Sequence, residues 1–290
     1  MAVLTDLGRE IGEIAGRVGP SVVGIGHRWR GGAGIVIGEK RVLTNAHNLR
    51  GDEVTVVFAD GRTAEATTLG VDADGDLAVL EVDTQNAPAL EPGGEPPAIG
   101  TAVVALGQPS GKGPRVTFGF VSSTDRAFRG PRGRRVAGAI EHTAPLMPGS
   151  SGGPIVNLDG RLLGINTNRI GHGFYQAIAA DDALRDRIAA LGRGQSPERR
   201  HLGIGLAPSH VARRLRRAVG LPERDGLLVR EVEEESPAAR AGLAEGDLIV
   251  AAGDRAIATA DDLFEALAGT GALELTIVRG AEELRVTVDA

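Results

Sequence analysis

The sequence predicts a mainly β protein of two domains, a β domain of the sandwich or barrel type followed by a smaller α+β domain. The length of 290 residues suits about two domains. From residue 21 to about residue 178, short runs rich in β-branched residues follow one another, separated by turns, which is typical of β-sandwiches and barrels. A polar, glycine-containing linker at 193–200 then separates the first domain, 1–192, from the second, 201–290.

The first domain begins with a predicted amphipathic helix. Its apolar residues recur at helical spacing, so we expect the helix to lie along the β domain. These residues are Leu4, Leu7, Ile11, Ile14 and Val18. The predicted strands that follow cover 21–25, 35–37, 54–58, 102–106 and 116–121. Two apolar runs around an Asn-Leu-Asp-Gly turn at 157–160 predict a hairpin, and the spacing over 181–191 predicts a closing helix.

The second domain mixes strands with short helices. We expect strands at 226–232 and 247–250, a helix over 236–243, a helix that starts at Thr259 or Asp261, and a hairpin over 273–288. Its 16 acidic and 10 basic side chains account for the whole net charge of −6. We therefore interpret the basic run at 213–217 as the exposed side of a helix. No nucleic-acid partner is expected, because such a site would need a basic domain with interleaved aromatic residues.

Composition excludes several kinds of chemistry. The chain has no cysteine, which excludes disulfides, catalytic thiols and cysteine-bound zinc. Its six histidines are scattered without paired ligand spacing, so no metal site is expected. No stretch is long enough to span a membrane, and Asp6, Arg9 and Glu10 interrupt the N-terminal apolar residues where a signal peptide would need a continuous run. The sequence as it stands predicts a cytoplasmic protein, unless an export signal has been removed.

A serine between glycines is the strongest chemical signal in the chain. Residues 148–154 read Pro-Gly-Ser-Ser-Gly-Gly-Pro, a segment that leaves a nucleophile unobstructed. A Gly-x-Ser-x-Gly pattern also describes the nucleophile elbow of α/β-hydrolases, where a helix follows the serine. Here the predicted hairpin follows instead. Ser151 is therefore expected in an all-β context, with its catalytic partners upstream in the sequence.

Two upstream residues complete a candidate triad, because His47 ends one apolar run and Asp76 precedes another. The chain order His, Asp, Ser is that of chymotrypsin-type enzymes. A serine hydroxyl needs a base to take its proton, histidine titrates near neutral pH, and a carboxylate can fix the histidine tautomer. The backbone N–H groups of Gly149 and Ser151 are expected to stabilise the oxyanion. Each signal alone is weak, and their joint occurrence in this order predicts catalysis.

These segments together resemble the HtrA (DegP-like) family of serine proteases. The resemblance rests on Gly-Ala-Gly-Ile-Val-Ile at 32–37, Leu-Thr-Asn-Ala-His at 43–47, Asp-Leu-Ala-Val-Leu at 76–80, the serine segment at 148–154 and Gly-Ile-Asn-Thr at 164–167. Three positions depart from the family pattern. Ser150 replaces the usual Asn, His142-Thr143 replaces the usual Thr-Asp, and residues 175–179 read Tyr-Gln-Ala-Ile-Ala instead of Gly-Phe-Ala-Ile-Pro.

The resemblance implies a chymotrypsin-like double β-barrel protease domain with no cofactor, followed by one PDZ domain. It also implies the triad above, unfolded or misfolded polypeptides as substrates, and a homotrimer as the assembly. His201-Leu202-Gly203-Ile204 takes the place of the PDZ loop that binds peptide C-termini. The alternative is that Leu202 and Ile204 are core residues of a first strand and the domain binds nothing.

The specificity of such an enzyme would depend on the pocket beside Ser151. Pro145 stands where trypsin-like pockets carry an acidic residue, so Leu146, Ala177 and Ile178 predict a small apolar pocket. Two rival hypotheses stay open. One is a catalytically silent relative that holds peptides because its nucleophile loop is not supported, and the other is an adaptor whose PDZ domain does the binding.

Overall fold

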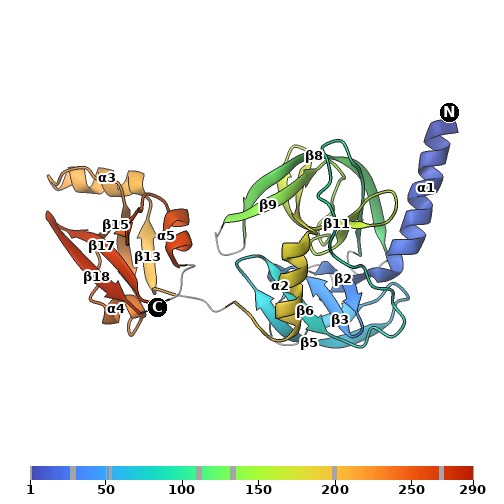
Figure 1. Cartoon of the computed structure of the whole chain (residues 1–290), viewed down its shortest axis with the longest axis horizontal. Helices are drawn as coiled ribbons and strands as arrows, with labels where there is room; N and C mark the ends of the chain where they lie inside the picture. The colour runs from blue at the N-terminus through green and yellow to red at the C-terminus, as the bar shows by residue number, and fades with distance from the viewer. Residues whose placement is uncertain are drawn as a thin grey trace. The chain divides into compact units, whose positions relative to one another are not determined.

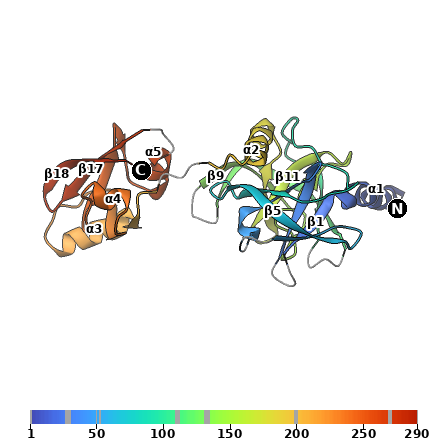
Figure 2. The same ribbon diagram turned by 90° about the horizontal axis from the view of Figure 1, so that it is seen from below.

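The computed structural model describes residues 2–26, 31–49, 51, 54–108, 113–130, 135–197, 201–267 and 271–289. The chain divides into two compact units, Met1–Pro197 and Glu198–Ala290 (Figures 1 and 2). The boundary lies within the predicted linker, of which 198–200 falls outside the described residues. The first part of that linker belongs to the first unit, because the Val71 N–H donates to the Ser196 hydroxyl over 2.9 Å.

Six strands of the first unit form one closed barrel in the order β1-β2-β3-β6-β5-β4. They are β1 (Val22–Ile25), β2 (Gly32–Gly38), β3 (Arg41–Thr44), β4 (Val54–Val57), β5 (Thr63–Asp72) and β6 (Leu77–Glu81). All neighbouring pairs are antiparallel. The short turns between these β-branched runs make the closed antiparallel arrangement possible.

Six later strands form a second closed barrel in the order β10-β11-β12-β9-β8-β7. They are β7 (Ala102–Gly107), β8 (Arg115–Arg129), β9 (Arg135–His142), β10 (Pro154–Val156), β11 (Leu162–Gly171) and β12 (Phe174–Ala179). The predicted hairpin is confirmed, since β10 and β11 pair across a turn in which the Asn157 N–H donates to the Arg161 carbonyl. The mainly β class and the double barrel are thus both present.

The two barrels share a core. Successive side chains of a strand point to opposite faces, so neighbours such as Ile35 and Val36 join different clusters. Val36 packs inside the first barrel, whereas Ile35 packs with Leu106 and Ile165 of the second barrel. Because both faces of these strands are buried, the two barrels pack into one compact unit with a shared core where they meet.

Two helices flank the barrels. In α1 (Ala2–Val18), Ile14 and Val18 are buried in the shared core, but Leu4 is 75% exposed and the start of the helix extends past the strands in Figure 1. The expectation that the whole helix lies on the β domain was therefore wrong for its first half. Helix α2 (Asp182–Gly192) is capped by Asp181, which accepts a bond from Leu184 N–H, and packs on β5 and β6. None of the helices in the described ranges is long and apolar enough to cross a membrane.

The second unit is a small sheet with three helices, in the strand order β13-β14-β15-β17-β18. Its elements are β13 (Ile204–Ala207), α3 (Ser209–Ala218), β14 (Leu227–Val232), α4 (Pro237–Arg240), β15 (Leu248–Ala252), β16 (Arg255–Ala256), α5 (Ala260–Leu267), β17 (Leu273–Arg279) and β18 (Glu282–Val288). Among the described residues, β13 lies at an edge of the sheet and pairs with β14 alone.

The basic run on α3 has structural partners within this unit. Arg213 forms an ion pair with Asp225, and Arg217 forms one with Glu223. Arg216 is buried and donates to the carbonyls of Pro222 and Gly280. The interpretation of the run as the exposed side of a helix is therefore correct for Arg214 and Arg217, which are exposed, but wrong for Arg216, which is buried.

Candidate active site

The barrel topology brings His47 and Asp76 together. His47 lies in a short 3-10 turn (Ala46–Asn48) that follows β3, and Asp76 directly precedes β6. Because β3 and β6 are neighbours, with Thr44 opposite Ala78, the two residues meet at one end of the barrel. The His47 Nδ1 atom lies 2.8 Å from Asp76 Oδ2 and 3.0 Å from Oδ1. This contact leaves Nε2 as the ring nitrogen that can act as a base.

The Asp76 carboxylate is buried and fully engaged. Besides His47 Nδ1, it accepts bonds from the His47 backbone N–H over 3.1 Å and from the Thr167 hydroxyl over 2.6 Å. The Asn45 side-chain amide donates to the Asp76 carbonyl over 2.9 Å. Thr167 was missed as a site residue, although its Gly-Ile-Asn-Thr segment belongs to the family resemblance. A carboxylate held in this way can orient the imidazole and stabilise it once it is protonated.

Ser151 lies in the loop between β9 and β10, where Gly149 and Gly152 have left-handed φ angles of 88° and 91°. Glycine is needed at 152, because a Cβ there would lie 2.0 Å from the Ala33 carbonyl oxygen. The first barrel holds the loop, since the Ser151 carbonyl accepts bonds from the Ala33 N–H and from the Asn48 side chain. Each of these bonds is shorter than 3.0 Å.

The Ser151 hydroxyl donates to the Thr167 carbonyl over 3.1 Å. Thr167 therefore contacts both Asp76, through its hydroxyl, and Ser151, through its backbone. Within the described part of the chain, neither the Gly149 N–H nor the Ser151 N–H donates a hydrogen bond. Neither N–H group is thus used in a bond within the described residues, and their role toward an oxyanion stays a prediction.

A hollow of about 140 Å³ lies beside Ser151, between the nucleophile loop and strands β11 and β12. Of the three residues predicted for the specificity pocket, Leu146 lines it. Ala177 and Ile178 do not line it, because their side chains are buried in the hydrophobic cores of the barrels. The wall on that strand is Tyr175, which is 6% exposed.

Tyr175 stacks on a buried histidine that sequence analysis noted only as a departure. The His142 and Tyr175 rings lie 5.8 Å apart at 26°, and His142 Nε2 lies 3.0 Å from Asn166 Oδ1. Burial lowers the pKa of His142 to about 4, although the bond to Asn166 opposes this shift. The backbone of Asn166 in turn bonds Gly152 and Gly153, so the neutral histidine supports the nucleophile loop.

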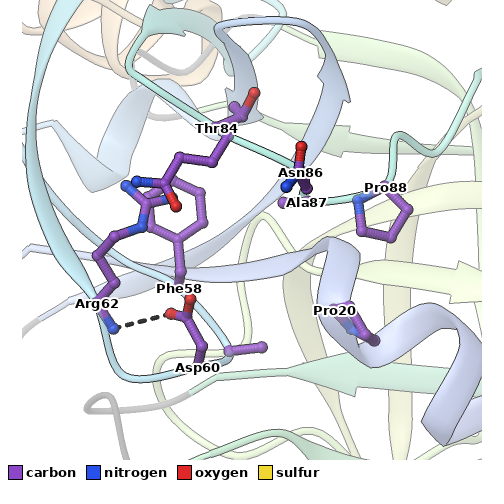
Figure 3. Close-up of a pocket in the computed structure, with 10 residues that line it drawn as sticks. Pro20, Phe58, Asp60, Arg62, Thr84, Asn86, Ala87 and Pro88 are labelled. Atoms are coloured by element: carbon purple, nitrogen blue, oxygen red, sulfur yellow. Dashed lines mark hydrogen bonds between the residues drawn. The ribbon is translucent and has the colours of Figure 1, made fainter.

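A second hollow of about 300 Å³ lies on the first barrel and contains no triad residue (Figure 3). Its Arg62 guanidinium lies 3.8 Å above the Phe58 ring, its backbone N–H donates to Asp60, and its Nη1 donates to the Asp83 carbonyl. Pro20 and Pro88 complete the wall on the opposite side. The contacts of Arg62 within the protein show that it helps to build this wall.

The predicted PDZ loop lies just before β13. Gly203 has a left-handed φ of 73°, and its carbonyl accepts the Glu233 N–H over 2.8 Å. Leu202 is buried in the core of this unit and Ile204 packs against that core, which matches part of the alternative interpretation. His201 is exposed, with Nε2 3.8 Å from the Glu233 carboxylate. The loop therefore lies beside the open edge of β13, and the Leu202 side chain is buried in the core of the unit.

The double barrel with this site, joined to a small α+β unit, defines a trypsin-like peptidase domain with a PDZ domain. Family models agree: a trypsin-like peptidase domain matches residues 32–165, and a PDZ domain matches residues 228–279. The chain belongs to the HtrA family of serine proteases and carries one PDZ domain.

Similar proteins support this membership. A probable periplasmic DegP-like serine endoprotease of Halomonas elongata is 35% identical over 89% of this chain and 55% of its own length. The mitochondrial serine protease HTRA2 of Drosophila virilis is 35% identical over 89% of this chain and 66% of its own length. The chain thus spans between about half and two thirds of these relatives. The solved HtrA-type protease AlgW with a decapeptide has a TM-score of 0.72 at 26% identity, covering 96% of this chain and 97% of that one.

Proposed function

We propose that this chain is a serine endopeptidase that cleaves unfolded or misfolded polypeptide segments. The observation that carries the proposal is the bonding around Thr167, which joins the paired His47 and Asp76 to Ser151. His47 is the general base and then the general acid, Asp76 orients it, and Ser151 is the nucleophile. The N–H groups of Gly149 and Ser151 stabilise the oxyanion.

The reaction follows from this assignment. The His47 Nε2 atom takes the Ser151 hydroxyl proton as the oxygen attacks the peptide carbonyl, and the imidazolium is stabilised by Asp76. The imidazolium then protonates the leaving amine, which departs and leaves an ester on Ser151. Water, deprotonated by His47, hydrolyses that ester and restores the serine. No cofactor is required by these steps.

The bond from the Ser151 hydroxyl to Thr167 favours a second candidate, a catalytically silent peptide holdase or adaptor. In the active enzyme this hydroxyl must leave the Thr167 carbonyl and donate to His47. Casein digestion by the wild type and by Ser151→Ala separates the two candidates. Equal fragment yields would show that Ser151 catalyses nothing, whereas the endopeptidase predicts that digestion stops in the variant.

The hollow beside Ser151 supports cleavage after small apolar residues. It is small, its lining includes Arg169 and none of its described lining residues is acidic, so a substrate Arg or Lys would enter without a counter-charge. Desolvating such a cation unpaired costs several kcal/mol. Peptide mapping of casein fragments should show Ala or Val before most cuts. Tyr175→Ala should extend cleavage to Leu and Phe, and an unchanged cleavage pattern would remove Tyr175 from the pocket.

We further propose that the PDZ domain binds free peptide C-termini through the 201–204 loop and the edge of β13. An extended peptide can add to an open sheet edge, and backbone N–H groups of a tight loop can meet its carboxylate. Calorimetry with one Val-ended peptide as free acid and as amide tests this. Equal affinities would make the loop structural. Measuring the molecular mass of the same samples tests the homotrimer that the family resemblance implies.

A further inference from the structure

The turn that presents Asp76 to His47 has a backbone conformation that needs support. Asp76 has a φ of 56°, in the left-handed region that side chains other than glycine adopt at a cost. Such conformations persist where surrounding contacts hold them, often beside active sites. The turn joins the end of β5 at Asp72 to the start of β6 at Leu77. Contacts to residues 72–75 therefore bear on the position of the carboxylate.

Asp72 forms one such contact and is itself held by Arg187 of α2. Its Oδ1 accepts the Gly75 N–H over 2.8 Å, which closes the turn immediately before Asp76. Its Oδ2 accepts a bond from Arg187 Nη2 over 2.7 Å. The Asp72 side chain is 12% exposed and that of Arg187 is 35% exposed, so this pair is more shielded from water than a surface ion pair.

Gly75 leaves the space in which the Arg187 guanidinium lies. A Cβ at position 75 would lie 1.7 Å from Arg187 Nη2 and 2.3 Å from Asp72 Oδ2. Any larger residue would have to displace the guanidinium or the carboxylate. The close packing shows that the turn and the arginine occupy one fitted arrangement rather than a loose surface contact.

The same C-terminal segment holds the residues just before Asp72. The Val71 N–H donates to the Ser196 hydroxyl, and Gly70 lies so close to the backbone of Leu191 that a Cβ would be 2.5 Å from the Leu191 oxygen. Residues 70, 71 and 72 are thus each contacted from the segment 187–196. This segment fixes the end of the strand from which the Asp76 turn departs.

We infer that Arg187 is a positioning residue for the triad, which acts through Asp72 and Gly75 on the turn that presents Asp76 to His47. The inference rests on the proposed peptidase function, since positioning matters to a rate only if the triad works. Without Arg187, the turn relaxes and Asp76 no longer holds the imidazole in one orientation. The expected loss is in kcat rather than in KM, because Arg187 is not among the residues that line the substrate hollow.

Arg185→Met is a matched control for Arg187→Met. Arg185 lies on the same helix, pairs with Asp182 and donates to the Pro92 carbonyl, so its loss also removes a contact of α2 but not one with the turn. On a short peptide substrate, Arg187→Met should lower kcat roughly tenfold with KM within about twofold of the wild type. Arg187→Lys should recover part of the loss, and Gly75→Ala, whose Cβ would clash with both the Arg187 guanidinium and the Asp72 carboxylate, should reproduce it. Arg185→Met should keep the wild-type kcat.

A second readout does not depend on turnover. In the Ser151→Ala background, the proton that His47 Nδ1 donates to Asp76 should give a downfield NMR signal that broadens in Arg187→Met and stays sharp in Arg185→Met, with similar thermal midpoints. A wild type without peptidase activity would overturn the proposed function, and the NMR comparison would still decide the role of Arg187. An unchanged signal in Arg187→Met would overturn the inference, as would equal kcat losses in both arginine variants of an active enzyme.

Discussion

The two barrels differ in the hydrogen bonds that their candidate catalytic side chains make. On the first barrel, His47 and Asp76 are already paired at 2.8 Å, and the carboxylate is held by further bonds from Thr167 and a backbone N–H. On the second barrel, the Ser151 hydroxyl donates to the Thr167 carbonyl, and its loop borders a hollow. The proposed acid–base pair is thus already hydrogen-bonded, whereas the Ser151 hydroxyl must leave the Thr167 carbonyl before it can act as the proposed nucleophile.

Replacing Ser151 or His47 should produce the largest loss of kcat among the predictions. Ser151→Ala and His47→Ala should each lower kcat by about 10⁴-fold to 10⁶-fold, and the double variant should be little worse, because the residues act as a unit. Ser150→Ala, one residue before the nucleophile, should stay within a few-fold of the wild type. Additive losses in the double variant of a peptide-hydrolysis assay would show that the two residues do not share one step.

The free energy of unfolding should also depend on pH, through His142 of the second barrel. The pKa of His142 is about 4 in the folded protein, below its value near 6.5 when unfolded, so the unfolded state binds the extra proton between these pH values. The free energy of unfolding should therefore fall by up to about 3 kcal/mol from pH 7 to pH 4. Urea titrations at several pH values measure this loss.

Two variants isolate the contribution of His142. His142→Gln should remove most of that pH dependence, although it lowers stability at pH 7. His210→Gln, at an exposed histidine, should leave the dependence unchanged. If His142→Gln keeps the full pH dependence, another group carries it and His142 does not stay neutral through burial.

A smaller effect is expected where the two barrels meet. Thr167→Val removes the hydroxyl that donates to Asp76 over 2.6 Å but keeps the carbonyl that Ser151 uses. Because hydrogen bonds to charged groups contribute about 1.5–3 kcal/mol, kcat should fall roughly tenfold or more. Thr143→Val, which removes a hydroxyl bonded to the Phe120 backbone of the second barrel, serves as the comparison. Equal rates for Thr167→Val and the wild type would show that the His47–Asp76 pair does not need the hydrogen bond from Thr167 of β11.

The smallest effect concerns the end of the first unit. A fragment that ends at Gly192 lacks the Ser196 hydroxyl that accepts the Val71 N–H, whereas a fragment that ends at Pro197 keeps it. The longer fragment should be more stable by about 1 kcal/mol in urea. Ser196→Ala in the full chain should show a loss of similar size. If the two fragments differ in stability but Ser196→Ala has no effect, the difference comes from the end of α2 and not from the Ser196 hydroxyl.

The sequence predicted the parts of this molecule that depend on local patterns. Short β-branched runs between turns predicted the strands, and the glycines around Ser151 predicted an unobstructed serine loop. Contacts between distant segments carry no such pattern: Thr167 lies 91 residues from Asp76, and Arg187 lies 115 residues from Asp72. These partners become visible only when the barrel closes.

The lining of the hollow beside Ser151 could not be derived from the order of residues alone. The pairing of β11 with β12 shifts register between Asn166 and Asn168 and again between Arg169 and Gly171. Each irregularity changes which side chains of the strands face the hollow. Tyr175 is consequently the wall on β12, and the predicted Ala177 and Ile178 are interior. The position of α1 could not be derived from the sequence either. Its apolar residues keep helical spacing from the first turn, but the barrels bury only those in its second half.

Covalent labelling with a fluorophosphonate probe tests most directly whether the prepaired His47 and Asp76 activate Ser151. The wild type should be labelled at Ser151, as located by peptide mass mapping, and His47→Ala should be labelled about 10³-fold more slowly. Ser151→Ala should take up no label in this loop. A folded wild type that stays unlabelled, or a His47→Ala variant labelled at the wild-type rate, would contradict the account.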